Sequence, residues 1–217
     1  MVRDVHLRGL VRRDTASMFL EPHGLPSSGD WALQHSGAVT IRNSESVIIE
    51  ECQFIRLDGV SGLARHRRDA LTCILPFCFV RTRMQLGVLV DGYNRNFTAQ
   101  SNEFAHLGGS AIALWGRSSL WLNENHTKTL PASSVIHPNG PDGSELEVPL
   151  DTHVISNIGF SLGLWQKQSS LLFAAVSGRT VVARNLAYNI PRAAINLNDG
   201  HLGGDSIHEN LLINTCR

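Results

Sequence analysis

The chain has no excess of charge of either sign. Its 19 Lys and Arg residues balance 19 Asp and Glu residues among 217, and charged residues are 18% of the sequence. A neutral chain lacks the electrostatic attraction on which binding to nucleic acid or anionic membranes depends. No run approaches the roughly 20 apolar residues of a membrane span, and residues 1–8 hold no apolar signal-peptide core. We expect no nucleic-acid partner, no membrane span and a chain that begins inside a domain.

Cysteine is also scarce, with four residues spread along the chain: Cys52, Cys73, Cys78 and Cys216. Zinc sites use close pairs such as C-x-x-C, and the ten histidines show no H-E-x-x-H spacing. We therefore expect no metal and no cofactor, and cysteines that pack as small hydrophobes. Hydrophobic residues are 42% and aromatic residues 6%, as in a soluble domain that buries a core.

An internal repeat in residues 181–216 indicates the architecture. Residues 185–189 (NLAYN) recur 25 residues later as residues 210–214 (NLLIN), and each copy follows a short β-prone run. Asn157 precedes Asn185 by 28 residues, so asparagine recurs at similar intervals. Repeats of this length are typical of solenoids, and short strands with asparagine corners fit the coils of a right-handed parallel β-helix. Asparagine tolerates left-handed backbone and stacked amides bond along a column, so Asn157, Asn185 and Asn210 are predicted to be structural. Asn189 and Asn214, which end the two copies of the repeat, are predicted to be corner residues too.

The same short-strand pattern covers much of the chain, with two interruptions. Residues 38–42, 47–50 and 52–54 predict one coil, and the pattern returns in residues 88–115 and from residue 154 onward. Residues 60–86 have neither strand periodicity nor corner residues, and residues 117–149 form a polar excursion. The predicted fold is therefore all-β: a single, incomplete right-handed β-helix domain over residues 1–217, with irregular insertions.

Candidate chemistry lies in a loop and at a strand end. The Gly- and Pro-rich loop 19–31 holds Glu21, His23, Asp30 and Trp31, and long loops on regular scaffolds often bind ligands. Alternation in residues 195–198 places Asn196 and Asn198 on one face of a strand and Ile195 and Leu197 on the other. Asp199 follows at the strand end beside glycines, so it is the catalytic candidate. The alternative is a plain Asp-Gly turn.

Asp199 lacks an evident partner in the sequence. Glycoside hydrolysis needs two carboxyl groups, and no acid lies one coil back near residue 174 or between Asn210 and Arg217. A polysaccharide lyase would instead need a base and a cation that neutralises a uronate. Lys167 and Arg192 are the candidate cations, and His201 and His23 the candidate bases. Two N-glycosylation sequons begin at Asn96 and Asn125 and have meaning only in a secreted protein.

Three segments carry a resemblance to a known family: residues 19–34, the stretch 167–170 (KQSS, with Gln168) and residues 189–217. Together they resemble right-handed β-helix repeat proteins of the pectin-lyase-like superfamily, and within it extracellular β-helical glycoside hydrolases. The resemblance covers residues 3–59, 88–116 and 150–217. It implies an extracellular or surface location, a polysaccharide or glycan partner, and Asp199 paired with an acid one coil later.

The chain departs from that family at two places. The acidic segment expected after Cys216 and Arg217 is absent, and residues 60–86 have no counterpart, so the sequence predicts a truncated or mis-spliced gene product. The predicted function is a glycoside-hydrolase-like, carbohydrate-active protein that is impaired in this form. A non-catalytic glycan-binding or structural β-helix and a polysaccharide lyase are the alternatives. The residues predicted to bind substrate are Glu21, His23, Asp30, Trp31, Lys167, Gln168, Arg192, Asn198 and His201.

Overall fold

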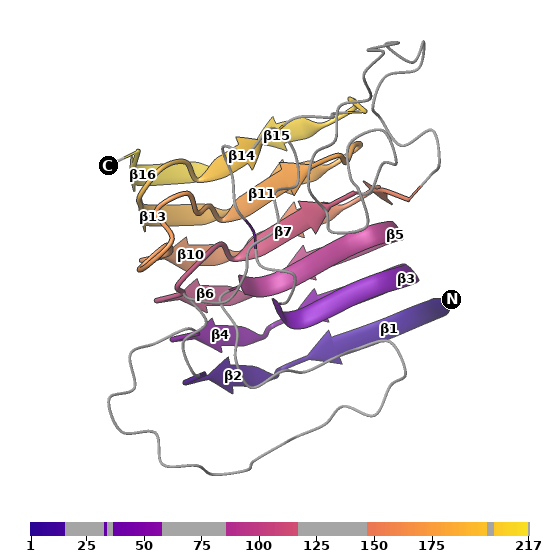
Figure 1. Cartoon of the computed structure of the whole chain (residues 1–217), viewed down its shortest axis with the longest axis horizontal. Helices are drawn as coiled ribbons and strands as arrows, with labels where there is room; N and C mark the ends of the chain where they lie inside the picture. Colours follow the sequence, from indigo (N-terminus) through magenta and orange to yellow (C-terminus); the bar gives the residue numbers. More distant parts are fainter. Residues whose placement is uncertain (16–32, 34–36, 58–85, 117–146, 199–201, 217) are drawn as a thin grey trace, which may run out of the picture.

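The described residues of the computed structural model are 1–15, 33, 37–57, 86–116, 147–198 and 202–216. In these ranges the chain forms sixteen β-strands and no helix. Every strand pairing among them is parallel. The strands form one sheet of ten strands and one of six (Figure 1). The predicted all-β, parallel-strand class is confirmed for this part of the chain.

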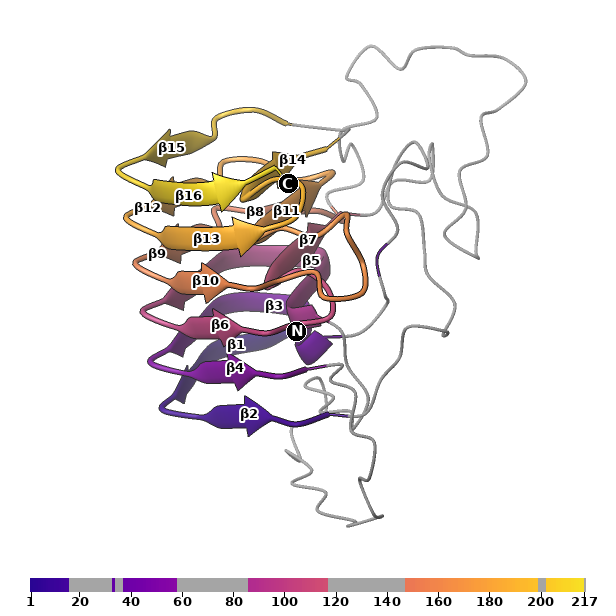
Figure 2. The ribbon, with the colours of Figure 1, turned by 90° about the vertical axis from the view of Figure 1, so that its left-hand side faces the viewer.

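The six-stranded sheet takes one short strand from each successive pass of the chain. Figure 2 shows its strands stacked in chain order. They are β2 (Val11–Arg13), β4 (Gln53–Ile55), β6 (Glu103–Ala105), β10 (Ile158–Phe160), β13 (Leu186–Ile190) and β16 (Leu211–Thr215). The strand register follows the 25-residue repeat of the sequence, since Leu186 pairs with Leu211 and Tyr188 with Ile213. Residues at one position therefore form a column across the sheet.

The ten-stranded sheet divides into two arms at its longest strands, β3 (Gly37–Glu50) and β5 (Leu86–Gln100). The register between them shifts after Arg42. The first arm contains residues 37–42 and 86–91 with β7 (Ile112–Trp115), β11 (Leu172–Ala175) and β14 (Ile195–Leu197). The second contains residues 44–50 and 94–100 with β1 (Val2–Arg8), β8 (Pro149–Leu150), β9 (His153–Ile155), β12 (Val181–Ala183) and β15 (Ser206–His208). The separate strands predicted at 38–42 and 47–50 are thus one continuous strand.

Both sheets bury apolar columns in one core, because alternate side chains of each strand face inward. Phe54 and Phe104 of the six-stranded sheet stack with ring centroids 5.0 Å apart. They belong to the same cluster as Val88 and Ile112 of the first arm and Val154 of the second. A pass of the chain hides its apolar face only against its neighbours, so the stack of passes is the stable unit.

A ladder of asparagine side chains runs between the second arm and the six-stranded sheet. The Oδ1 of Asn157 accepts from the backbone N–H of Asn102 at 3.0 Å, and the Oδ1 of Asn185 accepts from that of Asn157 at 2.9 Å. The Oδ1 of Asn210 accepts from Asn185 in the same way at 3.0 Å. Each Nδ2 also donates to a backbone carbonyl of the adjacent pass. The prediction of structural asparagines bonded along a column is confirmed, and Asn102 is a further member.

The left-handed backbone at this corner lies one residue earlier than predicted. Ser101, Ser156, Arg184 and Glu209 have φ of 54–57°, and each directly precedes a ladder asparagine. The sharp bend therefore falls on the preceding residue, and the asparagine side chain is free to point along the ladder. At the next corner the prediction is correct, since Asn189 and Asn214 themselves have φ of 54° and 55°.

Candidate functional site

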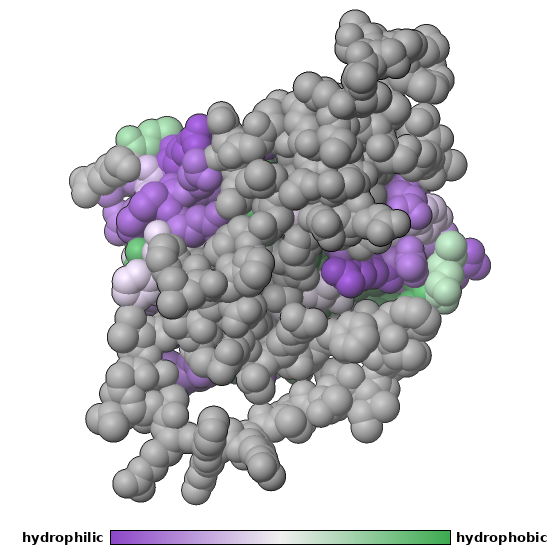
Figure 3. All heavy atoms as spheres, viewed as in Figure 1, coloured by the Kyte–Doolittle hydropathy of each residue, from purple (hydrophilic) through white to green (hydrophobic). Residues whose placement is uncertain are grey.

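A pocket of about 440 Å³ lies where the chain leaves the six-stranded sheet for the first arm. Its walls come from the carboxyl ends of β10, β13 and β16 and from the connections 161–171 and 191–194. In Figure 3 hydrophilic side chains gather on the side of the molecule where Figure 1 labels β13 and β16. The lining residues are Ser161, Leu162, Leu164, Lys167, Asn189, Ile190, Pro191 and Asn214.

The polar wall of the pocket is a column fixed by the strand register. Ser161, Asn189 and Asn214 each follow the aligned residues Phe160, Tyr188 and Ile213. All three have left-handed backbone, with φ of 52–55°. The side chain of Asn214 donates to Oδ1 of Asn189. One hydroxyl and two amides are thereby presented at the spacing of adjacent parallel strands, about 4.8 Å.

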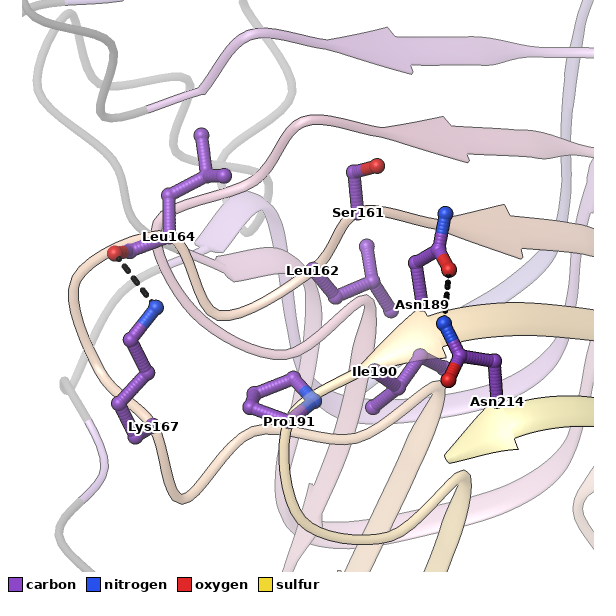
Figure 4. A pocket seen from close by; sticks show the side chains of 8 residues that line it. All are labelled: Ser161, Leu162, Leu164, Lys167, Asn189, Ile190, Pro191 and Asn214. Carbon is purple, nitrogen blue, oxygen red and sulfur yellow. Dashed lines mark hydrogen bonds between the residues drawn. The ribbon is translucent and has the colours of Figure 1, made fainter. Parts of the chain in front are cut away.

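Lys167 lies on the opposite side of the pocket from the asparagine pair (Figure 4). Its Nζ donates to the carbonyl oxygens of Gly163 and Leu164, both at 3.0 Å. An ammonium group has three N–H donors, so these two bonds hold the charge in place and leave a third for a ligand. The surrounding connection is itself tied down, because the backbone N–H of Leu164 donates to Leu107 at 3.0 Å.

Gly163 permits the tight turn that brings Lys167 to the pocket. Its φ is 64°, which L-residues with a side chain rarely adopt. A Cβ there would lie 2.7 Å from Cγ of Pro191 and 2.8 Å from the carbonyl oxygen of Gln166. Pro191 lies between Lys167 and the asparagine pair, together with the buried side chains of Leu162 and Ile190 (Figure 4). The pocket thus has an apolar floor with a cation on one wall and amides on the other.

The lining supplies groups suited to ligand recognition. Amides, a hydroxyl and an ammonium bind hydroxyl groups and anionic oxygens. None of the described lining residues is a carboxylate, histidine or cysteine that could act as a general acid, a base or a nucleophile. The described part of the chain also holds no group of three or more His, Cys, Asp or Glu residues arranged for a metal ion.

Of the predicted substrate-binding residues, Lys167 lines the pocket. Gln168 is half-buried and Arg192 exposed, both in the connections that form the pocket but outside its lining. Asn198 lies just past β14, where its backbone N–H donates to Ala174 at 2.7 Å. The remaining predicted residues lie outside the described part of the chain: Asp199, Glu21, His23, Asp30, Trp31 and His201.

The predicted alternation in β14 agrees with the packing. Ile195 pairs with Leu172 and packs against the main core. Asn196 pairs with Phe173 in the next strand. Phe173 and Leu89 belong to a second apolar cluster, which lies on the other face of the first arm. Asn196 continues that column with an amide, and its buried Nδ2 has no hydrogen-bond partner among the described residues. The strand that leads to Asp199 therefore turns a polar side chain away from the core.

Asp91 is a buried carboxylate that the sequence analysis did not single out. It lies on the same row of the first arm as Trp115, Ala175 and Asn198, and is 5% exposed. Its Oδ2 forms an ion pair with Nε of Arg42 at 2.5 Å. Three strand steps separate Asp91 from Asn198, about 14 Å. The ion pair of Asp91 with Arg42 lies at the bend of the sheet.

Comparisons of the chain with protein-family models, curated proteins and solved structures find no match. In the described ranges no helix is long and apolar enough to cross a membrane.

Proposed function

We propose that this chain is a right-handed parallel β-helix of the pectin-lyase-like kind, and that it binds an extracellular polysaccharide at the Lys167 pocket. Three observations support the β-helix. All described pairings are parallel, each pass of the chain adds a strand to the six-stranded sheet, and the asparagine ladder joins successive passes. The 25-residue repeat of the sequence is also the register offset between β13 and β16.

The arrangement of the pocket supports a glycan ligand. Sugars present hydroxyl groups on the edges of the ring and C–H groups on its faces. The pocket offers amide and ammonium donors on opposite walls and apolar side chains between them. Phe160 and Tyr188, the residues before Ser161 and Asn189, stack with ring centroids 4.9 Å apart and continue the site onto the outer face of the sheet.

The single observation that carries the proposal is the placement of Lys167 opposite Asn189 and Asn214. The test is titration of the chain with a panel of neutral and acidic polysaccharides by calorimetry. Lys167→Ala should weaken binding about ten- to hundredfold, since a hydrogen bond from a charged donor contributes about 1.5–3 kcal/mol. Asn189→Gly, which suits the left-handed backbone, should weaken it less. Gln100→Ala is the matched control, because Gln100 is exposed on the second arm.

Equal affinity of Lys167→Ala and wild type for every bound polysaccharide would remove the pocket from the proposal. Binding lost equally in Gln100→Ala would point to a general effect on folding, which the far-ultraviolet circular dichroism of each variant tests directly.

A second candidate function is glycoside hydrolysis with Asp199 as one of two carboxylates. The side chain of Asn196 favours this function, because it places a polar group on the face of β14 that points away from the core, shortly before Asp199 in the sequence. Reducing-end release from the bound polysaccharide, abolished in Asp199→Asn, would support it. Activity that survives Asp199→Asn excludes that role. A lyase, with Lys167 as the neutralising cation, differs by an unsaturated product that absorbs in the ultraviolet.

A further inference from the structure

Asn96 begins the sequence Asn96-Phe97-Thr98, and the structure places it at an outward corner. It lies in the second arm, between the part of β5 that pairs with β8 and the part that pairs with β9, and its backbone is left-handed with φ of 54°. The aligned residues of neighbouring passes, Ser46 and Asp151, are left-handed too, with φ of 55° and 58°. Asparagine adopts this backbone more readily than most residues, so the corner favours it without further constraint.

The side-chain amide of Asn96 has no part in the packing of the coils. It is exposed, and its Nδ2 makes one long hydrogen bond of 3.4 Å to the hydroxyl of Ser46. The amide of Asn102, six residues later, is 2% exposed and bonded to both neighbouring passes. A bulky group on Asn102 would break the ladder, whereas one on Asn96 would extend into solvent.

The other two residues of the sequon are compatible with a modified Asn96. Phe97 is 1% exposed and packs in the main core, so it anchors the corner. Thr98 lies on the outer face of the second arm, where it pairs with Ile48 and His153. The acceptor asparagine and its threonine thus remain on the surface of the folded chain.

We propose that Asn96 is a site of N-linked glycosylation. This proposal depends on the extracellular location that forms part of the proposed function. The reaction joins Nδ2 of Asn96 to the anomeric carbon of a lipid-pyrophosphate-linked oligosaccharide. The bond from that carbon to the pyrophosphate oxygen breaks, Nδ2 loses one proton, and the lipid pyrophosphate leaves.

The position of Asn96 keeps its glycan clear of the Lys167 pocket. Asn96 lies at a bend inside the second arm, whereas the pocket lies where the chain leaves the six-stranded sheet. Modification should therefore leave ligand binding unchanged while covering the corner that Ser46 and Asn96 share.

The test is translation of the full chain, behind an appended signal peptide, in the presence of microsomes. Asn125→Gln is the background, so that one standard sequon remains. Protease-protected chain should show one shift in gel mobility that peptide N-glycosidase removes, and mass spectrometry should find the resulting aspartate at position 96. Thr98→Ser should keep the shift, and both Thr98→Ala and Asn96→Asp should abolish it.

A protease-protected chain with bare Asn96, in microsomes that glycosylate a control glycoprotein in the same reaction, overturns the proposal. This readout is independent of polysaccharide binding. A glycosylated Asn96 with an inactive pocket would refute the proposed function alone. A bare Asn96 in the protease-protected chain, together with polysaccharide binding at the Lys167 pocket, would refute the modification site alone.

Discussion

Replacement of Asn157 by alanine tests whether the asparagine ladder holds the coils together. Its side chain is completely buried and makes four hydrogen bonds. Oδ1 accepts from the backbone N–H and Nδ2 of Asn102, both at 3.0 Å. Nδ2 donates to the carbonyl of Ala99 at 2.9 Å and to Oδ1 of Asn185 at 3.1 Å. The backbone of Asn157 is not left-handed, so alanine introduces no strain of its own.

The loss of stability follows from the groups that Asn157→Ala leaves without partners. In the variant, Nδ2 of Asn102 still donates to the carbonyl oxygen of Ile49, and Oδ1 of Asn185 still accepts from the backbone N–H of residue 157. The backbone N–H of Asn102 keeps neither a protein partner nor access to water. A buried unsatisfied group costs about 1–3 kcal/mol, so with the lost donor to Ala99 we expect a decrease of about 2–4 kcal/mol in the free energy of unfolding.

The assay is equilibrium urea denaturation combined with native-state hydrogen exchange at the amide of Asn102. Asn189→Gly is the control, because Asn189 is exposed, its side chain bonds only to Asn214 among the described residues, and glycine fits its backbone. It should change stability by less than about 0.5 kcal/mol. A decrease below about 0.5 kcal/mol for Asn157→Ala, with unchanged protection of the Asn102 amide, would refute the role assigned to the ladder.

Three further predictions follow from single contacts. Cys52 occupies a ladder position, with its backbone N–H donating to Oδ1 of Asn102 at 2.9 Å and its Sγ 3.2 Å from the carbonyl oxygen of Glu50. Cys52→Asn should increase the free energy of unfolding by about 0.5–1.5 kcal/mol, which urea denaturation would show as a higher midpoint. A lower midpoint would contradict this. Burial raises the pKa of the Cys52 thiol, so in a Cys73→Ser, Cys78→Ser background iodoacetamide should label exposed Cys216 first, as mass spectrometry can show. Hydrogen bonds from Arg56 and then Arg13 lower the pKa of Asp14 to about 2, so this carboxylate stabilises the fold above its unfolded pKa near 3.8 and loses that effect as pH falls toward 2. Because Asp14 is half-exposed, wild type should be more stable than Arg56→Ala by less than about 1 kcal/mol at pH 7. Most of this difference in the free energy of unfolding should be lost at pH 2, and a difference unchanged at pH 2 would contradict the prediction.

Much of the fold was predictable because the repeat of the sequence is a repeat of the register. The 25-residue offset from Asn185 to Asn210 gave the pairing of β13 with β16 directly. The ladder position of Asn102 was not predicted from the repeat, since its partners Cys52 and Asn157 lie 50 and 55 residues away in the sequence. The interruptions of the strand pattern lengthen these passes, and a variable offset carries no periodic signal even though the side chains meet in the same column.

The pocket was less predictable because it depends on the connection after one pass folding back against the next pass. Asn189 and Asn214 were recognised as corner residues and Lys167 as a possible ligand group, but nothing in their spacing brings them together. Their proximity arises because the turn at Gly163 carries Lys167 back against Pro191, in the connection that follows β13. The asparagines divide into two groups by the contacts of their amides. Those whose amides bond to both neighbouring passes are fixed structural members, whereas Asn96, Asn189 and Asn214 are at outer corners, where a side chain can serve a ligand or a modification without opening the core.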